Sequence, residues 1–519
     1  MENTTRILWV DDEIDMLKPH ILFLEQKGYA VDTTNNGDEA LDKVRETIYD
    51  IVFLDENMPG LSGLETLQRL KEIRESLPVV MITKSEEERI MEDAIGEQIA
   101  DYLIKPVNPN QILLSLKKSL QSRRFVTERT TSNYQQEFRK ISMELAEVRT
   151  WKDWAQLYKK LIYWEMALEK LEDEGLQQIL ISQKGEANNL FSRFVESEYR
   201  DWIEDAEDAP LLSHRLIKQE VAPVLRNGER VMMVVIDNLR YDQWKVIQPM
   251  VEEYFRVESE DTFYSILPTA TQFARNALFA GMMPNTILKK FPDKWVDDTD
   301  DEGKNMHEEF FLRAQMELLG LKDKKVNYTK VTNHQSGKKL SDSFANTRNF
   351  DLNVVVYNFV DMLSHSKTEM EVIKELADDD RGYRSLTESW FKNSPLLALM
   401  RQIAETNDRV MITTDHGTIN VTEPSKLVGQ RDLSTNLRYK AGRNMSYEKR
   451  DVFAMEDPEK FGLPKRNLSD EYVFAKSDKF FAYPNNYNHY VKYFRNTYQH
   501  GGLSMEEMII PFVWMRGKG

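Results

Sequence analysis

The sequence predicts a multidomain α/β protein with a doubly wound parallel sheet, a central all-α helical bundle and a larger C-terminal α/β domain. Three observations carry this prediction. Short apolar runs alternate with amphipathic stretches at the N-terminus, a long stretch nearly free of Gly and Pro follows, and a second set of apolar runs fills the rest. With 519 residues and about 150 residues per domain, the length also fits about three domains.

Five strand-like runs lie between Arg6 and about residue 122. They are ILWV, the stretch at residues 29–32, IVFLD, VVMIT and DYLIK, and amphipathic segments with helical spacing separate them. Strands that alternate with helices favour a parallel sheet with helices on both faces. The pattern therefore predicts a doubly wound domain over residues 1–122.

The second segment, residues 123–215, has almost no Gly or Pro as far as residue 209, while charged and aromatic residues recur at spacings of three and four. This spacing is typical of amphipathic helices. We expect a helical bundle that acts as a linker and spaces the two ends of the protein, with its Trp and Tyr side chains in helix contacts.

The third segment, residues 216–519, contains the runs VMMVVIDNLR, NVVVYNFVDMLSH and RVMITTDHG. Each run is strand-like and ends in polar residues. Because ligands of open α/β sheets bind beyond the carboxyl ends of the strands, these polar residues are candidates for a site.

Composition excludes several kinds of function. Asp and Glu outnumber Lys and Arg by 86 to 69, and the net charge of -17 argues against broad attraction to nucleic acid. A DNA-binding transcription factor is also disfavoured because no compact basic helix-turn-helix pattern occurs near the C-terminus. Without cysteine, a bound metal must use His and carboxylate. The first residues lack a leader pattern and no apolar run reaches the roughly 20 residues of a membrane span, which predicts a cytoplasmic protein without membrane insertion.

Three carboxylates, one hydroxyl and one ammonium group follow strands of the first predicted sheet. They belong to Asp11, Asp12, Asp55, Thr83 and Lys105. Taken singly, each residue fits a helix N-cap or a solvated strand end. At one edge of a parallel sheet, however, clustered carboxylates repel one another unless a hard divalent cation offsets their charge. The five residues together predict a Mg²⁺ site.

This Mg²⁺ would be held by Asp12, Asp55 and the backbone carbonyl of Asn57, and it would neutralise an incoming phosphoryl group. Lys105 and Thr83 would bind the phosphoryl oxygens. Asp55 is then the nucleophile.

The motifs VDDE, DENMPG and YLIKP resemble those of receiver domains of response regulators, and the resemblance covers residues 1–122. It implies that Asp55 accepts a phosphoryl group from a sensor histidine kinase. It also implies that Tyr102 is the aromatic switch residue of the domain. We expect phosphorylation to promote a homodimer through this domain.

Six potential metal ligands lie in the third segment. They are Asp237, Asp361, His365, Asp415, His416 and His500. Oxygen and imidazole ligands without thiolate suit Zn²⁺ or Mn²⁺, and six are enough for two ions. A two-metal site about 4 Å across clamps the attacking and leaving oxygens of a displacement at phosphorus. The remaining histidines are expected to be structural or surface residues, namely His20, His214, His307, His334 and His489.

The nucleophile of such a reaction would be Thr271, which lies just before a helical pattern. A metal could ionise its hydroxyl, and the helix N-terminus would favour an anionic phosphate. On its own, Thr271 also fits an N-cap. Arg275 and Asn276, one helical turn further on, are candidates either for binding a nonbridging oxygen or for a surface role.

The order of these residues and the C-terminal stretch YQHGGLSMEEMIIPFV resemble the PglZ branch of the alkaline phosphatase superfamily, from about residue 221 to the end. The resemblance implies two metal ions. The first would be held by the residues Asp237, Thr271, Asp415 and His416. The second would be held by the residues Asp361, His365 and His500.

The order of receiver, helical linker and PglZ-like domain resembles the PorX-like response regulators, which are associated with type IX secretion. This resemblance implies a sigma factor or a component of the secretion system as a partner. Our leading hypothesis is a two-metal phosphodiesterase controlled by phosphorylation of Asp55, with nucleotide or oligonucleotide diesters as substrates. The alternative is a catalytically silent regulator that acts only by binding protein partners.

Overall fold

The structure is a computed structural model that consists of two compact units. It describes residues 5–74, 76–83, 99–171, 173–296, 305–358, 377, 379–429, 433–434, 436–485 and 487–518, without the side chains of 121–132 and 174. The first unit comprises Met1–Phe138 and Lys170–Glu172, and the second comprises Arg139–Glu169 and Asp173–Gly519. Among the described residues, no helix combines the length and the apolar character that crossing a membrane requires.

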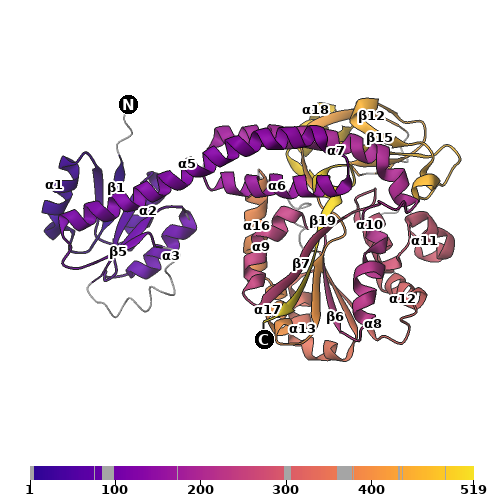
Figure 1. Cartoon of the computed structure of the whole chain (residues 1–519), viewed down its shortest axis with the longest axis horizontal. Helices are drawn as coiled ribbons and strands as arrows, with labels where there is room; N and C mark the ends of the chain where they lie inside the picture. Colours follow the sequence, from indigo (N-terminus) through magenta and orange to yellow (C-terminus); the bar gives the residue numbers. More distant parts are fainter. Residues whose placement is uncertain are drawn as a thin grey trace. The chain divides into compact units, whose positions relative to one another are not determined.

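The first unit contains a five-stranded parallel sheet in the order β2-β1-β3-β4-β5 (Figure 1). The strands are β1 (Arg6–Val10), β2 (Ala30–Thr34), β3 (Ile51–Asp55), β4 (Val79–Thr83) and β5 (Asp101–Ile104). All five predicted strands are confirmed. Because every strand runs in the same direction, their carboxyl ends lie at one edge of the sheet.

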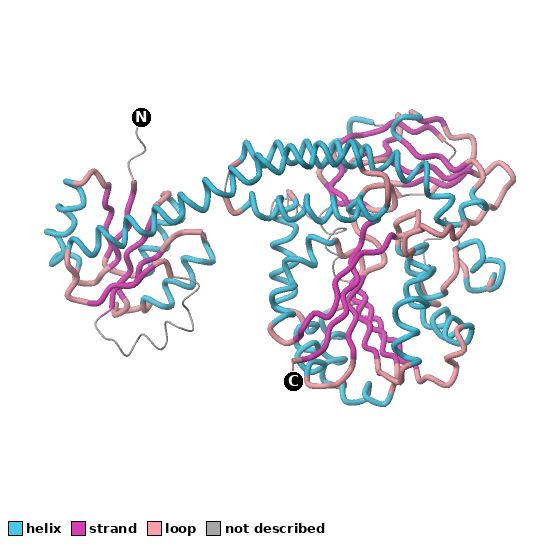
Figure 2. The backbone as a smooth tube through the Cα atoms, in the orientation of Figure 1, coloured by secondary structure: helices cyan, strands magenta, loops and turns pink. Residues whose placement is uncertain are grey.

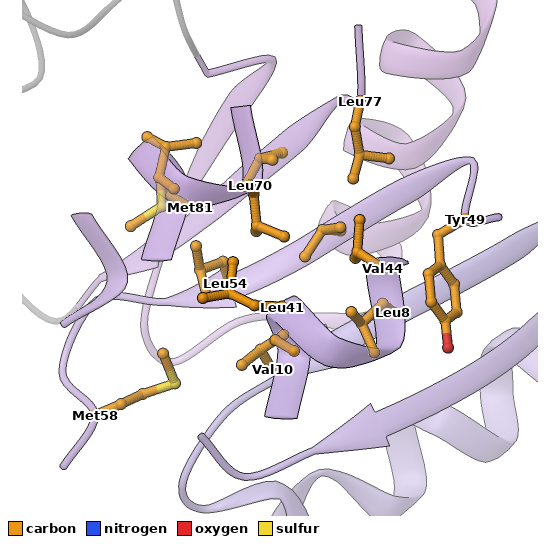
Figure 3. Close-up of a cluster of buried hydrophobic side chains, with 14 residues drawn as sticks. Leu8, Val10, Leu41, Val44, Tyr49, Leu54, Met58, Leu70, Leu77 and Met81 are labelled. Atoms are coloured by element: carbon orange, nitrogen blue, oxygen red, sulfur yellow. The ribbon is translucent and has the colours of Figure 1, made fainter. Parts of the chain in front are cut away.

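Helices cover both faces of this sheet. They are α1 (Lys18–Gln26), α2 (Gly37–Glu46), α3 (Gly63–Ile73) and the start of α5 (Pro109–Glu147). Side chains alternate along β1, so that Leu8 and Val10 join one core cluster while Trp9 joins the other. Figure 3 shows the first cluster, in which Leu41 of α2 and Leu70 of α3 pack against the strands.

The second unit contains a six-stranded mixed sheet in the order β7-β19-β10-β6-β9-β8. The strands are β6 (Val231–Ile236), β7 (Phe255–Tyr264), β8 (Val326–Val331), β9 (Leu352–Tyr357), β10 (Arg409–Thr413) and β19 (Ile509–Gly517). The predicted strands β6, β9 and β10 are confirmed and are parallel, while β19 is antiparallel to β10. The carboxyl ends of β6, β9 and β10 therefore share an edge with the start of β19.

Helices also cover both faces of this second sheet. Figures 1 and 2 show α9, α16 and α17 on one side and α8, α10 and α12 on the other. The helices around this sheet are α8 (Ala222–Arg226), α9 (Tyr241–Glu252), α10 (Thr271–Ala280), α11 (Pro284–Lys290), α12 (Glu308–Leu318), α13 (His334–Asp342), α16 (Asp380–Asn393) and α17 (Pro395–Ala404).

The predicted linker segment is helical, with α6 (Trp151–Glu169) and α7 (Glu174–Ile203) following α5. Helices α6 and α7 belong to the second unit. Trp154 of α6 packs against Phe191 of α7, and Trp202 of α7 packs edge-on against Tyr264 at the end of β7. The two helices therefore share a core with the C-terminal α/β domain.

Short strands between β10 and β19 form a further layer that the sequence did not predict. They are β11 (Ile419–Val421), β12 (Glu423–Val428), β13 (Tyr439–Gly442), β14 (Ser446–Tyr447), β15 (Val452–Met455), β16 (Glu471–Ala475), β17 (Lys479–Ala482) and β18 (Thr497–Gln499). Helices α18 (Tyr487–Phe494) and α19 (Met505–Met508) complete the layer. It packs against α7, where Tyr199 stacks on Phe461.

Candidate functional site

The structure brings three carboxylates together at the carboxyl edge of the first sheet. Oxygen atoms of Asp11, Asp12 and Asp55 all lie within 4.8 Å of one another. Asp11 and Asp55 are completely buried, whereas Asp12 is exposed. Asp12 therefore gives this cluster access to solvent.

Lys105 supplies the positive charge of this cluster. Its Nζ lies 2.9 Å from Asp11 Oδ2 and 2.8 Å from Asp55 Oδ1. Burial opposes the charged form of Lys105, but the two carboxylates outweigh burial and raise its pKa. Burial and the nearby charge of Asp11 raise the pKa of Asp55 against the influence of Lys105.

The donor set of this cluster fits a hard divalent cation. One ammonium group faces three carboxylates, which leaves excess negative charge, and Asp55 Oδ2 is buried without a hydrogen bond from the described residues. Carboxylate oxygen is the ligand that Mg²⁺ prefers. Thr83 is 2% exposed at the end of β4, and Asn57 is exposed beyond β3. Tyr102 is half-buried and packs against the core cluster of Figure 3.

Gly63, the first residue of α3, lies directly beside Asp55, the predicted phosphoryl acceptor. A Cβ atom at Gly63 would lie 2.4 Å from the carbonyl oxygen of Asp55 and 2.7 Å from Cα of Glu56. Both neighbours are backbone atoms that cannot rotate away. Glycine therefore permits the close approach of α3 to the loop after β3.

A second cluster lies at the carboxyl edge of the six-stranded sheet. Ligand atoms of Asp237, Asp415 and His416 lie within 4.8 Å of one another, and all three residues are buried. Asp237 follows β6, and Asp415 and His416 follow β10. The parallel pairing of β6 and β10 brings these residues together although 178 positions separate Asp237 from Asp415.

Backbone contacts orient the members of this cluster. His416 Nδ1 lies 3.0 Å from the carbonyl oxygen of Gly417, which places the ring proton on Nδ1 and turns Nε2 toward the carboxylates. The backbone N–H groups of Asn238 and His416 donate to Asp415 Oδ1 at 3.3 and 3.1 Å. Two oriented carboxylates and one imidazole are a donor set that suits Zn²⁺ or Mn²⁺.

Thr271 lies beside this cluster as the first residue of α10. Its Oγ1 is 3.1 Å from His416 Nε2 and 3.4 Å from Asp237 Oδ1. The N-cap position belongs to Ala270, so the capping interpretation of Thr271 is wrong. The Thr271 hydroxyl thus faces Asp237 and His416 and does not cap its own helix.

His500 stacks on His416, with the ring centroids 4.4 Å apart. Its Nδ1 lies 3.1 Å from the carbonyl oxygen of Thr269. Four of the six predicted metal ligands are therefore together. The other two, Asp361 and His365, lie outside the described residues.

Arg275 and Asn276 are both buried, so the interpretation that they are surface residues is wrong. Arg275 Nη1 lies 2.6 Å from Asp237 Oδ2, and its Nε donates to Glu308 at 2.6 Å. Asn276 donates to the backbone oxygen of Gln272 at 2.8 Å. Arg275 therefore contacts the cluster directly.

Sequence reasoning missed the residues that support Arg275 and Asp415. Burial alone would raise the pKa of Glu308, but Arg275 and Lys330 lower it below its usual value. Ser265 donates to the backbone oxygen of Asp415 at 2.7 Å. No local pattern separates these residues from other Glu and Ser residues, so only the tertiary structure reveals them.

A separate cavity of about 830 Å³ in the second unit has charged walls formed partly by α6, α7 and α16. Lys184, one of its two lining lysines, is surrounded by Glu165, Asp380 and Glu506 at 2.9 to 3.4 Å. Arg240 also pairs with Asp380 and Arg384 with Glu165, so each of these two carboxylates has a second cation. The cavity is not lined by the predicted metal ligands, and it gives no further evidence of a site.

Comparisons with known families agree with this arrangement. A family model of the response regulator receiver domain matches residues 7–117, and one of the PorX response regulator linker domain matches residues 124–203. A model of the BREX system PglZ alkaline phosphatase-like domain matches residues 216–515, which is more than half of the chain.

Curated relatives match the receiver region. The transcriptional regulatory protein ResD of Bacillus subtilis (strain 168) is 36% identical over 118 residues, which cover 23% of this chain and 49% of ResD. The transcriptional regulatory protein ZraR of Klebsiella oxytoca is 37% identical over 114 residues, which cover 22% of this chain and 26% of ZraR. The chain thus spans between about a quarter and a half of the length of these relatives.

Solved structures also resemble the first domain. A CheY-like receiver domain protein from Methanospirillum hungatei JF-1 is 28% identical, with a TM-score of 0.22, and the match covers 23% of this chain and 96% of that one. The response regulator protein TrrA from Thermotoga maritima is 33% identical, with a TM-score of 0.21, and the match covers 22% of this chain and 100% of the TrrA chain.

The protein is therefore a response regulator in which a receiver domain precedes a PorX-type linker and an alkaline phosphatase-like domain. By its largest domain the chain belongs to the PglZ family. The receiver domain implies a sensor kinase as phosphodonor, and domains of both kinds usually bind metals.

Proposed function

We propose that this protein is a phosphodiesterase whose activity is controlled by phosphorylation of Asp55. The observation that carries this proposal is the position of Thr271. Its hydroxyl lies 3.1 Å from His416 and 3.4 Å from Asp237, at the N-terminus of a ten-residue helix. A nucleophile beside a potential metal site and a helix N-terminus suits the attack on an anionic phosphorus centre.

Two ions complete the proposed site. The first would be held by Asp237, Thr271, Asp415 and His416, and the second by Asp361, His365 and His500. The chemistry that bound Zn²⁺ or Mn²⁺ supplies is Lewis acidity and neutralisation of the negative charge that builds up at phosphorus.

The residues of the chain have separate tasks. Thr271 Oγ1 is the proposed attacking atom: as it loses its proton it would bond to phosphorus while the bond to one ester oxygen breaks, that oxygen would leave as an alcohol, and water would then cleave the ester on Thr271. The N-terminus of α10 would attract a nonbridging phosphate oxygen. Arg275 fixes the orientation of the Asp237 carboxylate through its ion pair.

The receiver is proposed to act as the switch. Asp55 would accept the phosphoryl group from a sensor histidine kinase, with Mg²⁺ held by Asp12, Asp55 and the carbonyl of Asn57. Lys105 and Thr83 would bind the phosphoryl oxygens, and Tyr102 would respond to them. We expect the phosphorylated protein to form a homodimer through the receiver domain.

The mass in solution tests the switch, measured with and without a small-molecule phosphodonor. Wild-type protein should dimerise and Asp55→Ala should remain monomeric. A mutant that responds equally would overturn the switch.

The remaining parts of the proposal concern the setting of the protein. We place the domain boundaries at residues 1–122, 123–215 and 216–519, and the matched family ranges support them. We propose a cytoplasmic protein, nucleotide or oligonucleotide diesters as substrates, and a link to type IX secretion through a sigma factor or a secretion component. The match to a PorX-type linker supports this last link.

Hydrolysis of bis-p-nitrophenyl phosphate with Zn²⁺ or Mn²⁺ tests the activity. Thr271→Ala should abolish turnover, while Thr286→Ala, a change of an exposed threonine on α11, should leave it intact. A wild-type protein without turnover under either metal, but with intact partner binding, would favour the catalytically silent regulator instead.

A further inference from the structure

Asn188 of helix α7 forms a two-point contact with α19. Its Nδ2 donates to Glu506 Oε2 at 2.9 Å, and its Oδ1 accepts from the backbone N–H of Met505 at 2.8 Å. Asn188 and Glu506 are each 3% exposed. Because donor and acceptor are both used inside the protein, the contact fixes the amide orientation and the position of α19 relative to α7.

Neighbouring turns of α7 reinforce this contact. Lys184 Nζ lies 3.2 Å from Glu506 Oε1, and Ser192 Oγ donates to the backbone oxygen of Leu503 at 3.3 Å. Lys184, Asn188 and Ser192 follow one another at a spacing of four, so they share one face of the helix. This face of α7 therefore holds the segment that runs from Leu503 to Glu506.

The segment from His500 to Glu507 in turn forms part of the candidate metal centre. The backbone N–H of Gly417, the residue after His416, donates to the carbonyl oxygen of Glu507 at 3.0 Å. A Cβ atom at Gly417 would lie only 2.0 Å from the carbonyl oxygen of Glu506. A shift of α19 would therefore press on the backbone that carries His416.

The same helix holds the loop that carries the proposed nucleophile. The hydroxyl of Tyr199 accepts a hydrogen bond of 2.7 Å from the backbone N–H of Leu267, four residues before Thr271. Tyr199 is completely buried. Removing its hydroxyl would leave the N–H of Leu267 without this partner, which costs free energy in an interior site.

We infer that α7 positions the metal centre through α19 and the loop before α10, and that Asn188 and Tyr199 are positioning residues of the proposed reaction. Asn188 fixes the segment of His500, and Tyr199 fixes the loop of Thr271. The helix predicted to be a spacer thus sets the distance between the second-ion ligand and the nucleophile. This inference rests on the proposed phosphodiesterase function.

Two measurements on the full-length protein test the role of Asn188. One is the number and affinity of bound Zn²⁺ ions, determined by competition with a chromogenic chelator. The other is the kcat and KM for bis-p-nitrophenyl phosphate. Asn188→Leu, which has similar volume but forms neither hydrogen bond, should weaken one of the two ions at least tenfold and lower kcat by about tenfold to a hundredfold, with KM little changed.

Asn189→Leu is the matched control. Asn189 is exposed and its side chain donates to Gly185 of its own helix, so ion affinity and kcat should remain at the wild-type values. Circular dichroism establishes that both variants are folded. If Asn188→Leu does not fold, Ser192→Ala, which removes the hydroxyl contacts with the backbone oxygens of Leu503 and Asn188, should produce the same loss to a smaller degree.

Tyr199→Phe tests the second contact, with Tyr163→Phe at an exposed position of α6 as its control. We expect kcat to fall at least fivefold while the number and affinity of bound ions stay unchanged. A merely structural role would not separate these two readouts in this way.

Two results would overturn the inference: a folded Asn188→Leu protein with wild-type ion affinity and kcat, or a folded Tyr199→Phe protein with wild-type kcat. The proposed function fails differently, through a wild-type protein without turnover. In that case the weakening of one ion in Asn188→Leu still supports the role of Asn188, and its absence overturns that role.

Discussion

The two carboxylate clusters of this protein hold their positive charge in different ways. In the receiver, Lys105 reaches Asp11 and Asp55 on a flexible stem, and its side chain is 15% exposed. In the alkaline phosphatase-like domain, the Arg275 side chain is 1% exposed and pairs with Asp237 on one side and Glu308 on the other. Lysine is a mobile point charge, whereas the planar guanidinium fixes its partners. The receiver cluster is therefore suited to reversible binding of a charged group. The cluster around Asp237 is suited to holding its side chains in a fixed geometry.

Removal of the two cations should have unequal effects on stability. Arg275→Met leaves Asp237 buried without its cation and leaves Glu308 with Lys330 alone, so the free energy of unfolding of the second unit should fall by about 3–5 kcal/mol. Lys105→Met should destabilise the receiver by a smaller amount because Asp12 opens that cluster to solvent. Urea unfolding, followed separately for each unit, measures both effects.

Arg313→Met serves as the control for this comparison, because Arg313 is 52% exposed and pairs with Glu309 on the surface. It should change stability by less than about 0.5 kcal/mol. Equal losses of unfolding free energy for Arg275→Met and Lys105→Met would show that the ion pair between Arg275 and Glu308 does not make the second cluster more dependent on its cation than the first.

The two clusters also differ in how much of each could be predicted from the sequence. The five receiver residues lie at the carboxyl ends of β1, β3, β4 and β5 within the first 105 positions, and the parallel pairing of these strands puts those ends at one edge of the sheet. The sequence therefore predicted the receiver fold, and its site needed no long-range information. In the alkaline phosphatase-like domain the strand ends of β6 and β10 were predictable in the same way, which is why Asp237, Asp415 and His416 could be named.

The supporting residues could not be predicted, because their partners are distant in the chain. Glu308 meets Arg275 from another helix, and Asn188 meets Glu506 across 318 positions. Strands β7, β8 and β19 were missed for a related reason. Strands β7 and β8 contain exposed or half-buried positions, so they have no continuous apolar run. Strand β19 is apolar but follows α19 directly, so no turn marks its start.

Substitution of one glycine beside each carboxylate cluster should have the next largest effect. Gly417→Ala places Cβ against the carbonyl oxygen of Glu506, and Gly63→Ala places it against the carbonyl oxygen of Asp55. Overpacking against backbone costs about 1–3 kcal/mol. We expect Gly417→Ala to reduce Zn²⁺ affinity and Gly63→Ala to reduce phosphorylation of Asp55, as measured by chelator competition and by phosphoprotein electrophoresis.

Gly185→Ala is the control for these substitutions. Gly185 lies inside α7 and its added Cβ would meet no atom within 4 Å. The change should stabilise the helix by up to about 1 kcal/mol without altering either site. A Gly417→Ala protein with wild-type Zn²⁺ affinity would contradict the tight packing of α19 on the metal centre.

Acid should destabilise the second unit through His214. Burial, together with Arg215 and Lys218, lowers the pKa of His214 to about 3, and its Nε2 accepts a hydrogen bond from Arg215 at 3.2 Å. The unfolded chain takes up a proton near pH 6.5 but the folded protein does not until about pH 3, so stability falls as the pH falls through this window. Between pH 7 and pH 5 this histidine should cost about 1–2 kcal/mol.

His214→Gln, which keeps an acceptor for Arg215, should flatten the acid limb of the unfolding free energy of the second unit. The acid limb of the receiver should not change. If the pH dependence of both units stays the same, His214 is already protonated or exposed in the folded protein.

The smallest expected effect concerns the cap of α3 beside the receiver cluster. Ser62 Oγ accepts from the backbone N–H of Glu65 at 3.2 Å, and the Glu65 carboxylate accepts from the backbone N–H of Ser62 at 3.0 Å. Ser62→Ala should cost about 1 kcal/mol of receiver stability. Because β3 and Lys105 fix Asp55 independently of this cap, Mg²⁺ affinity measured by calorimetry should stay unchanged. A loss of Mg²⁺ affinity would mean that the first turn of α3, and not the strand edge, sets the geometry of the acceptor.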